Sequence, residues 1–367
     1  MDASVIARVR GVLDGLGKTQ AQLAEDIATT PDKLSKSLAG TRKFTATELA
    51  LIAELGGTSV EWLLSGRARS APSLAARSSS SAIEGAGDVK DVAERFVEAH
   101  EQLTTLAGTS ESLKPLPTLK STWSYVAEGN ALAEEAVEVM RGHGEDAAEI
   151  ASLPEAVEAA FQVDVAVAQL PESFDGCAWQ DEGLRLIILS PSDYLARQRF
   201  TLAHELGHIL ACDAQDLIAE RVTGHGDLRS EKRANTFAAA FLLPEDTVRR
   251  AVSGPVTDDV FIQMVTDFRV SPATMAWRLV NLGIVQRSAI DEWRYMTTEQ
   301  CMMLRGLTGE IVTDRQRARA ERIPPRLLVG HLQAYWQKHA SARPLAKLLQ
   351  RDPAEVIGML KPIVAEA

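Results

Sequence analysis

Two histidines four residues apart give the clearest chemical signal in this sequence. They lie in the segment His204-Glu205-Leu206-Gly207-His208. On a helix, residues i and i+4 project from one face, so both imidazoles can bind the same ion. Neutral imidazoles suit Zn²⁺, and a carboxylate beside them can act on a water that the metal activates. The spacing therefore predicts a zinc site with Glu205 as the catalytic general acid and base.

An open catalytic zinc site needs a third protein ligand. A second strongly helical stretch follows the histidines, and its apolar residues recur at helical spacing: Ala234, Phe237, Ala238, Phe241 and Leu242. Glu231 lies just before this stripe and on the same side, far enough from His208 for a loop and a returning helix. We expect Glu231 to be the third ligand and Asn235, one turn later, to hydrogen-bond a ligating histidine.

Other nearby residues leave alternatives open. His225 is a candidate transition-state stabiliser, or else a solvent-exposed loop histidine. Cys212, four residues after His208, could supply a sulfur ligand, or else be a small core residue. The motif itself could be a buried histidine pair without a metal, or a structural zinc site, which would need four protein ligands.

The surrounding pattern predicts a mainly α protein with a small antiparallel sheet. Leu202, Ala203, Leu206, Ile209 and Leu210 form an apolar stripe, which places the histidines on a core-facing helix. Residues 163–168 and 184–189 have strand patterns, and Asp175-Gly176 and Asp181-Glu182-Gly183 are expected as turns between them. Ser271-Pro272 and Pro324-Pro325 begin later helices.

Composition divides the chain into four expected parts. Residues 1–66 have closely spaced helix signals, including Thr19 as a helix cap, Thr30-Pro31 as a helix start and Gly40 as a stop. Residues 67–90 are rich in serine and glycine and are expected to be a flexible linker. Residues 91–285 contain the metal motif, and residues 286–367 are expected to form a helical C-terminal domain.

Cysteine content and charge exclude several classes of protein. The three cysteines are far apart, which excludes a disulfide framework and a cysteine-rich zinc module. No apolar run is long enough for a membrane helix, and the N-terminus has no signal pattern, so we expect a cytoplasmic protein without a membrane partner. A net charge of −11 means that DNA binding must be local, and we expect a homodimer to be needed for it.

Residues 120–285 resemble the ImmA/IrrE family of metallopeptidases. The resemblance includes Arg199-Phe200-Thr201-Leu202-Ala203 before the motif, the later Glu-x-x-Ala-Asn-x-Phe-Ala with Leu243-Pro244, and Phe174-Asp175-Gly176 with the Ile187-Ile188 strand. It implies an α+β, zincin-like metallopeptidase domain with a gluzincin-like ligand set of two histidines and one glutamate. It also implies cleavage of a DNA-binding repressor in a stress-response, mobile-element or toxin–antitoxin setting.

The first 66 residues resemble an XRE-type (lambda-repressor-like) helix-turn-helix. Thr19-Gln-Ala-Gln-Leu-Ala is similar to that family's second helix, and Thr30-Pro-Asp-Lys-Leu-Ser-Lys to its recognition helix. Base-edge contacts are then expected from Gln20, Lys33, Ser35 and Lys36, and backbone contacts from Arg42 and Lys43. The alternative is a helical interaction or dimerisation module.

These observations together predict a zinc-dependent endopeptidase that is also a DNA-binding regulator and acts on a repressor protein. The alternative is a transcription factor or an antitoxin-like binding protein in which the zinc site is regulatory or structural.

Overall fold

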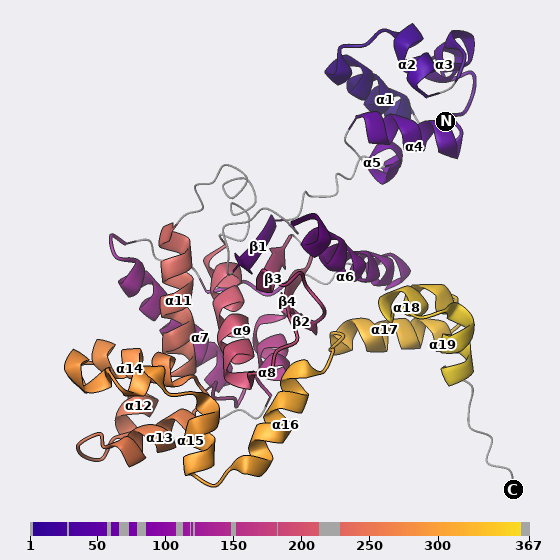
Figure 1. The fold of residues 1–367 in the computed structure, drawn as a ribbon. Coiled ribbons are helices and arrows are strands. Elements are labelled where there is room, and N and C mark those ends of the chain that lie inside the picture. The colour runs from indigo at the N-terminus through magenta and orange to yellow at the C-terminus, as the bar shows by residue number, and fades with distance from the viewer. Residues whose placement is uncertain are drawn as a thin grey trace, which may run out of the picture. The chain divides into compact units, whose positions relative to one another are not determined.

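The computed structural model describes residues 3–27, 29–56, 60–65, 73–78, 86–107, 113–117, 119, 122–147, 152–181, 183–212 and 228–360 (Figure 1). These residues are mostly helical and include one four-stranded sheet, which confirms the predicted mainly α class with a small sheet. The chain divides into two compact units, Met1–Pro72 and Ser73–Ala367. Among the described helices, none is long and apolar enough to cross a membrane.

The first unit is helical throughout its described part. Its helices are α1 (Ala3–Leu16), α2 (Gln20–Asp26), α3 (Pro31–Leu38), α4 (Ala46–Leu55) and α5 (Val60–Ser65). Thr19 caps α2 through a capping box with Gln22, and the Thr30 side chain accepts a hydrogen bond from the Lys33 N–H at the start of α3. Both helix starts are therefore where the sequence predicts them. Their apolar faces meet in a core that includes Val9, Leu23, Leu34, Ile52 and Leu63.

The second unit begins with β1 and combines the sheet with the remaining helices. The elements up to the metal motif are β1 (Ser73–Ser78), α6 (Ala86–Ala107), α7 (Tyr125–Gly142), α8 (Leu153–Phe161), β2 (Asp164–Val167), β3 (Phe174–Gln180), β4 (Arg185–Leu189) and α9 (Leu195–Ala211). After them come α11 (Leu228–Leu242), α12 (Glu245–Ala251), α13 (Asp258–Asp267), α14 (Pro272–Asn281), η1 (Arg287–Ile290), η2 (Trp293–Tyr295), α15 (Thr298–Leu304), α16 (Thr308–Arg319), α17 (Pro325–Trp336), α18 (Ala342–Leu348) and α19 (Pro353–Leu360).

The sheet is mixed, which corrects the expected antiparallel sheet. Its strand order is β1-β3-β4-β2, with β3 antiparallel to both of its neighbours and β2 parallel to β4. The β3–β4 hairpin fixes the direction of β4, and β2 joins at the far side of β4 through a crossover. Alternation of apolar residues predicts strands but carries no information about the direction of their partners.

Asp175-Gly176, expected as a turn, lies inside β3. The hairpin turn comes later, where the Asp181 carboxylate accepts hydrogen bonds from the N–H groups of Gly183 and Leu184, both at 2.8 Å. The second expected turn is therefore confirmed and the first is wrong.

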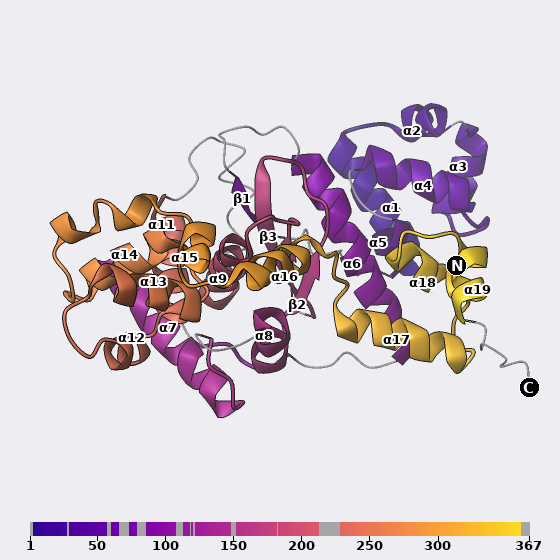
Figure 2. The same cartoon turned by 60° about the horizontal axis from the view of Figure 1, so that its bottom comes forward.

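Helices cover both faces of the sheet (Figure 2). On one face α7, α8, α9 and α11 share a core with Ile187 and Leu189 of β4. On the other face α6 packs with Leu186 and Ile188, and Leu327 of α17 belongs to the same cluster. Because alternate residues of a strand point to opposite faces, a continuous apolar run such as β4 is expected in a sheet buried on both sides.

Two domain boundaries differ from those predicted from composition. Within residues 67–90, expected as a flexible linker, residues 73–78 form β1 and α6 starts at Ala86, so that part of the prediction is wrong; the rest lies outside the described residues. In the C-terminal segment, the main chain of Arg322 exchanges two hydrogen bonds of 2.9 Å with Val167 of β2. The guanidinium of Arg322 also binds Glu158 of α8. Residues after 286 are thus tied directly to the sheet.

Helices α7 and α11 approach each other closely at a glycine. A β-carbon at Gly129 of α7 would lie 2.8 Å from the carbonyl oxygen of Arg233 and 2.8 Å from the β-carbon of Thr236, both on α11. Contacts this short force a shift of backbone atoms, because neither neighbour is a flexible side-chain tip. Gly129 therefore sets the spacing between these two helices.

We expect Gly129→Ala to lower the free energy of unfolding by roughly 1–3 kcal/mol, because it overpacks the α7–α11 contact. Gly142→Ala, at the end of the same helix with no atom within 4 Å of the added β-carbon, is the matched control. It should be neutral or stabilising by up to about 1 kcal/mol. Urea unfolding of the two variants measures the difference, and equal stabilities would contradict this account of the helix contact.

Candidate metal centre

His204, His208 and Glu231 converge on one point between α9 and α11. The Nε2 atoms of the histidines are 3.1 Å apart. Carboxylate oxygens of Glu231 lie 3.5 Å from Nε2 of His204 and 3.7 Å from Nε2 of His208. Both histidine side chains are 1% exposed, and that of Glu231 is 27% exposed. The cluster is therefore buried on the histidine side and reachable from the Glu231 side.

These separations fit a tetrahedral zinc ion. Nitrogen and oxygen ligands about 2.0–2.1 Å from zinc lie about 3.3 Å from one another when the angles are tetrahedral. The three ligand atoms are close to that spacing, and the set of two imidazoles and one carboxylate leaves a fourth position for water or substrate. In the described part of the chain, this is the group of three residues placed to hold a metal ion.

Asn235 orients one of the histidines. Its side-chain oxygen lies 3.2 Å from Nδ1 of His204. With the proton on Nδ1, His204 donates a hydrogen bond to Asn235, and the lone pair on Nε2 faces Glu231 and His208. Asn235 thus stands in the position that helical spacing predicts for it.

Glu205 lies on the side of α9 that faces the sheet. Its side chain is fully buried, and α9 packs directly against β3. Burial raises the pKa of the Cys177 thiol in β3 well above its ordinary value, and the negative charge of Glu205 raises this pKa further. The negative charge of Glu205 therefore reaches Cys177 of β3, and Glu205 directly follows His204 of the candidate metal group.

A buried carboxylate on α7 anchors the first turn of α11. Glu128 accepts hydrogen bonds from Arg229 at 2.8 Å and Arg233 at 3.3 Å, which flank Glu231 in sequence. Burial raises the pKa of Glu128, but hydrogen bonds from the Thr122 N–H and the two arginines outweigh it, and the pKa lies below its ordinary value. Glu128 is thus a charged anchor for the helix that carries the third ligand. No motif around Glu128 predicts this role, because its arginine partners are about a hundred residues away in sequence.

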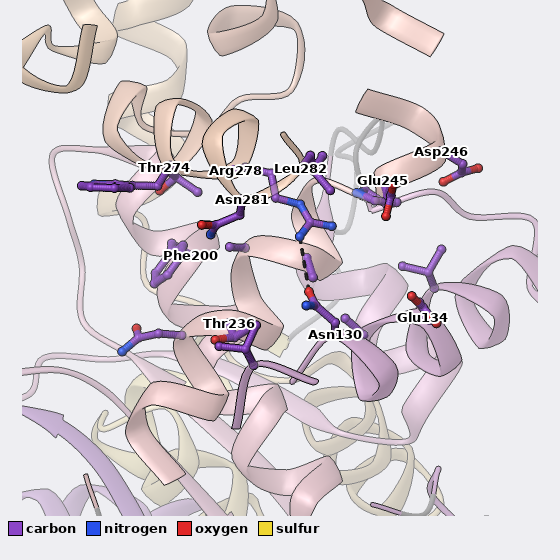
Figure 3. A pocket seen from close by; sticks show the side chains of 18 of the residues that line it. Asn130, Glu134, Phe200, Thr236, Glu245, Asp246, Thr274, Arg278, Asn281 and Leu282 are labelled. Atoms are coloured by element: carbon purple, nitrogen blue, oxygen red, sulfur yellow. Dashed lines mark hydrogen bonds between the residues drawn. The ribbon is translucent and has the colours of Figure 1, made fainter. Parts of the chain in front are cut away.

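A cavity of about 1460 Å³ has Asn235 in its wall, whereas His204, His208 and Glu231 do not line it. Its lining residues come from α7, α9, α11, α12 and α14, and include Asn130, Phe200 and Arg278 (Figure 3). On its wall Arg278 donates hydrogen bonds to the Leu243 carbonyl at 2.9 Å and to the Asn130 side chain at 3.3 Å. Asn235 is the residue that links this cavity to the metal group, because it lines the cavity and its side chain contacts His204.

Two further candidates near the motif have different outcomes. His225 lies outside the described residues. Cys212 ends α9 in the left-handed conformation, with φ 55°, and is exposed. Because the helix ends at Ala211, Cys212 does not continue the face of His208, and it is not part of the three-residue group.

The expected DNA-contact residues lie on the first unit. Gln20 starts α2, Lys33, Ser35 and Lys36 lie on α3, and all four are exposed, as is Lys43. Arg42 differs, because its guanidinium binds the Ser37 hydroxyl at 2.8 Å and the Glu48 carboxylate at 3.0 Å. It therefore ties α3 to α4 within the unit and is the least accessible of the six.

Residues 172–280 match a family model. The model is Peptidase M78, the IrrE N-terminal-like domain. The matched segment contains β3, β4, α9 and α11, and so includes all three residues of the metal group. The match supports the resemblance to the ImmA/IrrE family and a peptidase role for this Peptidase M78-like segment. No curated protein matches the chain.

We expect Asn235→Ala to weaken zinc binding by roughly tenfold to hundredfold, because His204 loses the partner that fixes its tautomer and orientation. Glu231→Gln should weaken it more, since it removes a charged ligand. Thr236→Ala is the matched control on the same helix, because the Thr236 hydroxyl bonds the Lys232 carbonyl of that helix. Competition with a chromophoric chelator measures all three affinities, and an unchanged affinity in Asn235→Ala would refute the orienting role.

Proposed function

We propose that this chain is a zinc-dependent endopeptidase with a gluzincin-like ligand set, His204, His208 and Glu231, and with Glu205 as its catalytic residue. One observation carries the proposal. Three side chains from two helices bring their ligand atoms to the spacing of a tetrahedral zinc site, within a segment that matches Peptidase M78.

Each residue has a distinct part in the proposed reaction. A bound zinc ion would supply Lewis acidity that activates a water and polarises the substrate carbonyl. Glu205 takes the proton of the attacking water on its carboxylate and delivers it to the nitrogen of the leaving amine. Asn235 holds His204 in the tautomer that binds metal, and the Glu128 anchor keeps Glu231 in place. The buried setting of Glu205 limits the access of bulk water during this transfer.

We further propose that the substrate is a repressor protein and that the first unit binds DNA as an XRE-type helix-turn-helix in a homodimer. The support is the resemblance of residues 1–66, the capped helices α2 and α3 and the exposed polar residues on α3. A regulator that binds DNA near its target would meet a DNA-bound repressor at high local concentration. Stress response, mobile-element induction and toxin–antitoxin control are the settings that the resemblance suggests.

A second candidate function rests on the same first unit. The chain would then be a transcription factor or an antitoxin-like binding protein, and the metal group would regulate or stabilise it without proteolysis. The observation behind this alternative is the first unit, whose capped helix α3 carries exposed polar residues. Hydrolytic activity decides between the two functions.

Glu205→Gln should leave zinc stoichiometry unchanged and lower peptide hydrolysis by roughly 10²–10⁴-fold, because the general base is lost while the ligands remain. Cleavage of β-casein measures the activity, with Glu172→Gln, an exposed carboxylate before β3, as the control. If a neighbouring gene encodes a repressor-like protein, that protein is tested as a second substrate. Equal cleavage by Glu205→Gln and the control would rule out the proposed catalytic role. Absence of cleavage by the zinc-loaded wild type would favour the second function.

Replacing both Lys33 and Lys36 with alanine should weaken binding to a random-sequence DNA duplex. It should also reduce the magnitude of the slope of log K against log[salt] by about 2. Both side chains are exposed on α3, although Lys36 also pairs with Asp32 at 2.8 Å. Lys90→Ala on α6 is the control, since it removes a similar exposed charge from the second unit. Fluorescence anisotropy gives the affinities, and an unaltered salt slope would argue against α3 as the DNA-facing helix.

A further inference from the structure

Strand β1 covers the edge of β3 that would otherwise be open. It pairs antiparallel with β3 over its whole length, from Ser73 opposite Gln180 to Ser78 opposite Phe174. β1 is the first element of the second unit and belongs to the segment that follows the first unit in sequence. The outer position of this sheet is therefore filled by a segment whose composition is that of a linker.

The covered edge lies beside the catalytic helix. A β-carbon at Gly176 of β3 would be 2.7 Å from the Thr201 methyl group, so β3 and α9 are in close contact at this point. Thr201 is one helical turn before Glu205, and the helix contacts β1 as well as β3. A chain paired with β3 therefore runs past the part of α9 that carries Glu205.

An extended peptide is the natural ligand of such an edge. The edge of a sheet presents a row of N–H and C=O groups, and a peptide can add to it as a further strand through main-chain hydrogen bonds. This mode of binding would hold a polypeptide extended beside Glu205. β1 uses the same row of groups on β3, so a peptide and β1 cannot bind at the same time.

We propose that β1 is a removable strap: it occupies the peptide-binding edge of β3, and a substrate segment must displace it to pair antiparallel with residues 174–180. The identification of the ligand as a substrate rests on the proposed peptidase function. The pairing site itself requires only that an extended peptide can take the place of β1.

The sequence and pairing of β1 suit displacement. Among its six residues, Ser-Leu-Ala-Ala-Arg-Ser, only Leu74 is a large apolar residue. It pairs with β3 through a main-chain ladder, and an incoming strand can replace these hydrogen bonds one for one. The register also shifts between Arg77 and Ser78, which interrupts the ladder at one end.

The test uses the full-length chain with Ala75→Pro and Ala76→Pro combined. Adjacent residues of a strand direct their N–H groups to opposite sides, so one of the two prolines removes a bond to β3 whichever residue donates it. Ala82→Pro, in the same serine-rich stretch but outside β1, is the matched control. The readouts are amide hydrogen exchange of residues 174–180, affinity for a labelled peptide with the sequence of residues 71–80, and zinc-dependent hydrolysis of β-casein.

The double proline variant should exchange the β3 amides faster than the control. It should also bind the labelled peptide roughly tenfold or more tightly than wild type, because the fraction of chains with a free edge rises. Zinc-dependent hydrolysis of β-casein by this variant should increase as well. Unchanged exchange and unchanged peptide affinity would overturn the strap even if hydrolysis is observed. Tighter peptide binding without hydrolysis in any variant would support the strap and overturn the peptidase proposal.

A cross-link provides an independent test that does not rely on a weakened strand. Ala76 lies directly opposite Cys177, which is a free cysteine, and opposed residues of an antiparallel pair are close enough for a disulfide. Because the Cys177 thiol is buried and its pKa is raised, the Ala76→Cys variant is oxidised during refolding, when both thiols are accessible. The cross-linked chain should then lose peptide binding and hydrolysis until a reductant is added, with Ala82→Cys as the control. Peptide binding by the cross-linked chain at the wild-type level would refute the proposal.

Discussion

The packing of α11 between α7 and α9 is the constraint on which the candidate site depends. His204 and His208 are fixed relative to each other by one turn of helix, but Glu231 reaches them only if α11 has the right height and rotation. Gly129 sets how closely α7 approaches, and the Glu128 anchor holds the first turn of α11 through Arg229 and Arg233. An ion pair with this degree of burial adds little net stability, but it fixes the position of a helix, because a shifted partner would leave a charge buried without compensation.

The metal group is predictable from local spacing in the sequence. The strand pairing and the ion pairs between distant residues are not. His204, His208 and Asn235 follow from helical periodicity, and Glu231 follows from the apolar stripe that it precedes. β3 was hidden because Asp175-Gly176 has the composition of a turn, while the glycine in fact permits close contact with Thr201. The parallel pairing of β2 with β4 and the role of Glu128 depend on residues distant in sequence, which a local pattern cannot report.

The β3 side and the β2 side of the sheet are covered in different ways. At β2, Arg322 makes a two-bond bridge to Val167, and its side chain binds Glu158, so this edge is held by both main-chain and charged contacts. At β3, the cover is β1, which pairs antiparallel with β3 from Ser73 to Ser78 and has a register shift at its end. If β2 or β3 were left uncovered, its free edge could pair with a strand of another chain. The β1 cover lies beside α9, the helix that carries Glu205, which is where controlled access to a peptide would matter.

The C-terminal helices contribute to the core on one face of the sheet. The sequence predicts residues 286–367 to be a helical domain of their own, yet Leu327 of α17 and Leu348 of α18 pack into the cluster formed by α6 and the sheet. Together with α6 they bury the face of β3 and β4 opposite α9, including Cys177 and Trp179. With both faces buried, β3 has no freedom to tilt away from α9, and the side on which a further chain can pair with it is the one where β1 lies. Helices α17 and α18, which are far in sequence from the candidate metal group, therefore help to keep β3 in place beside Glu205.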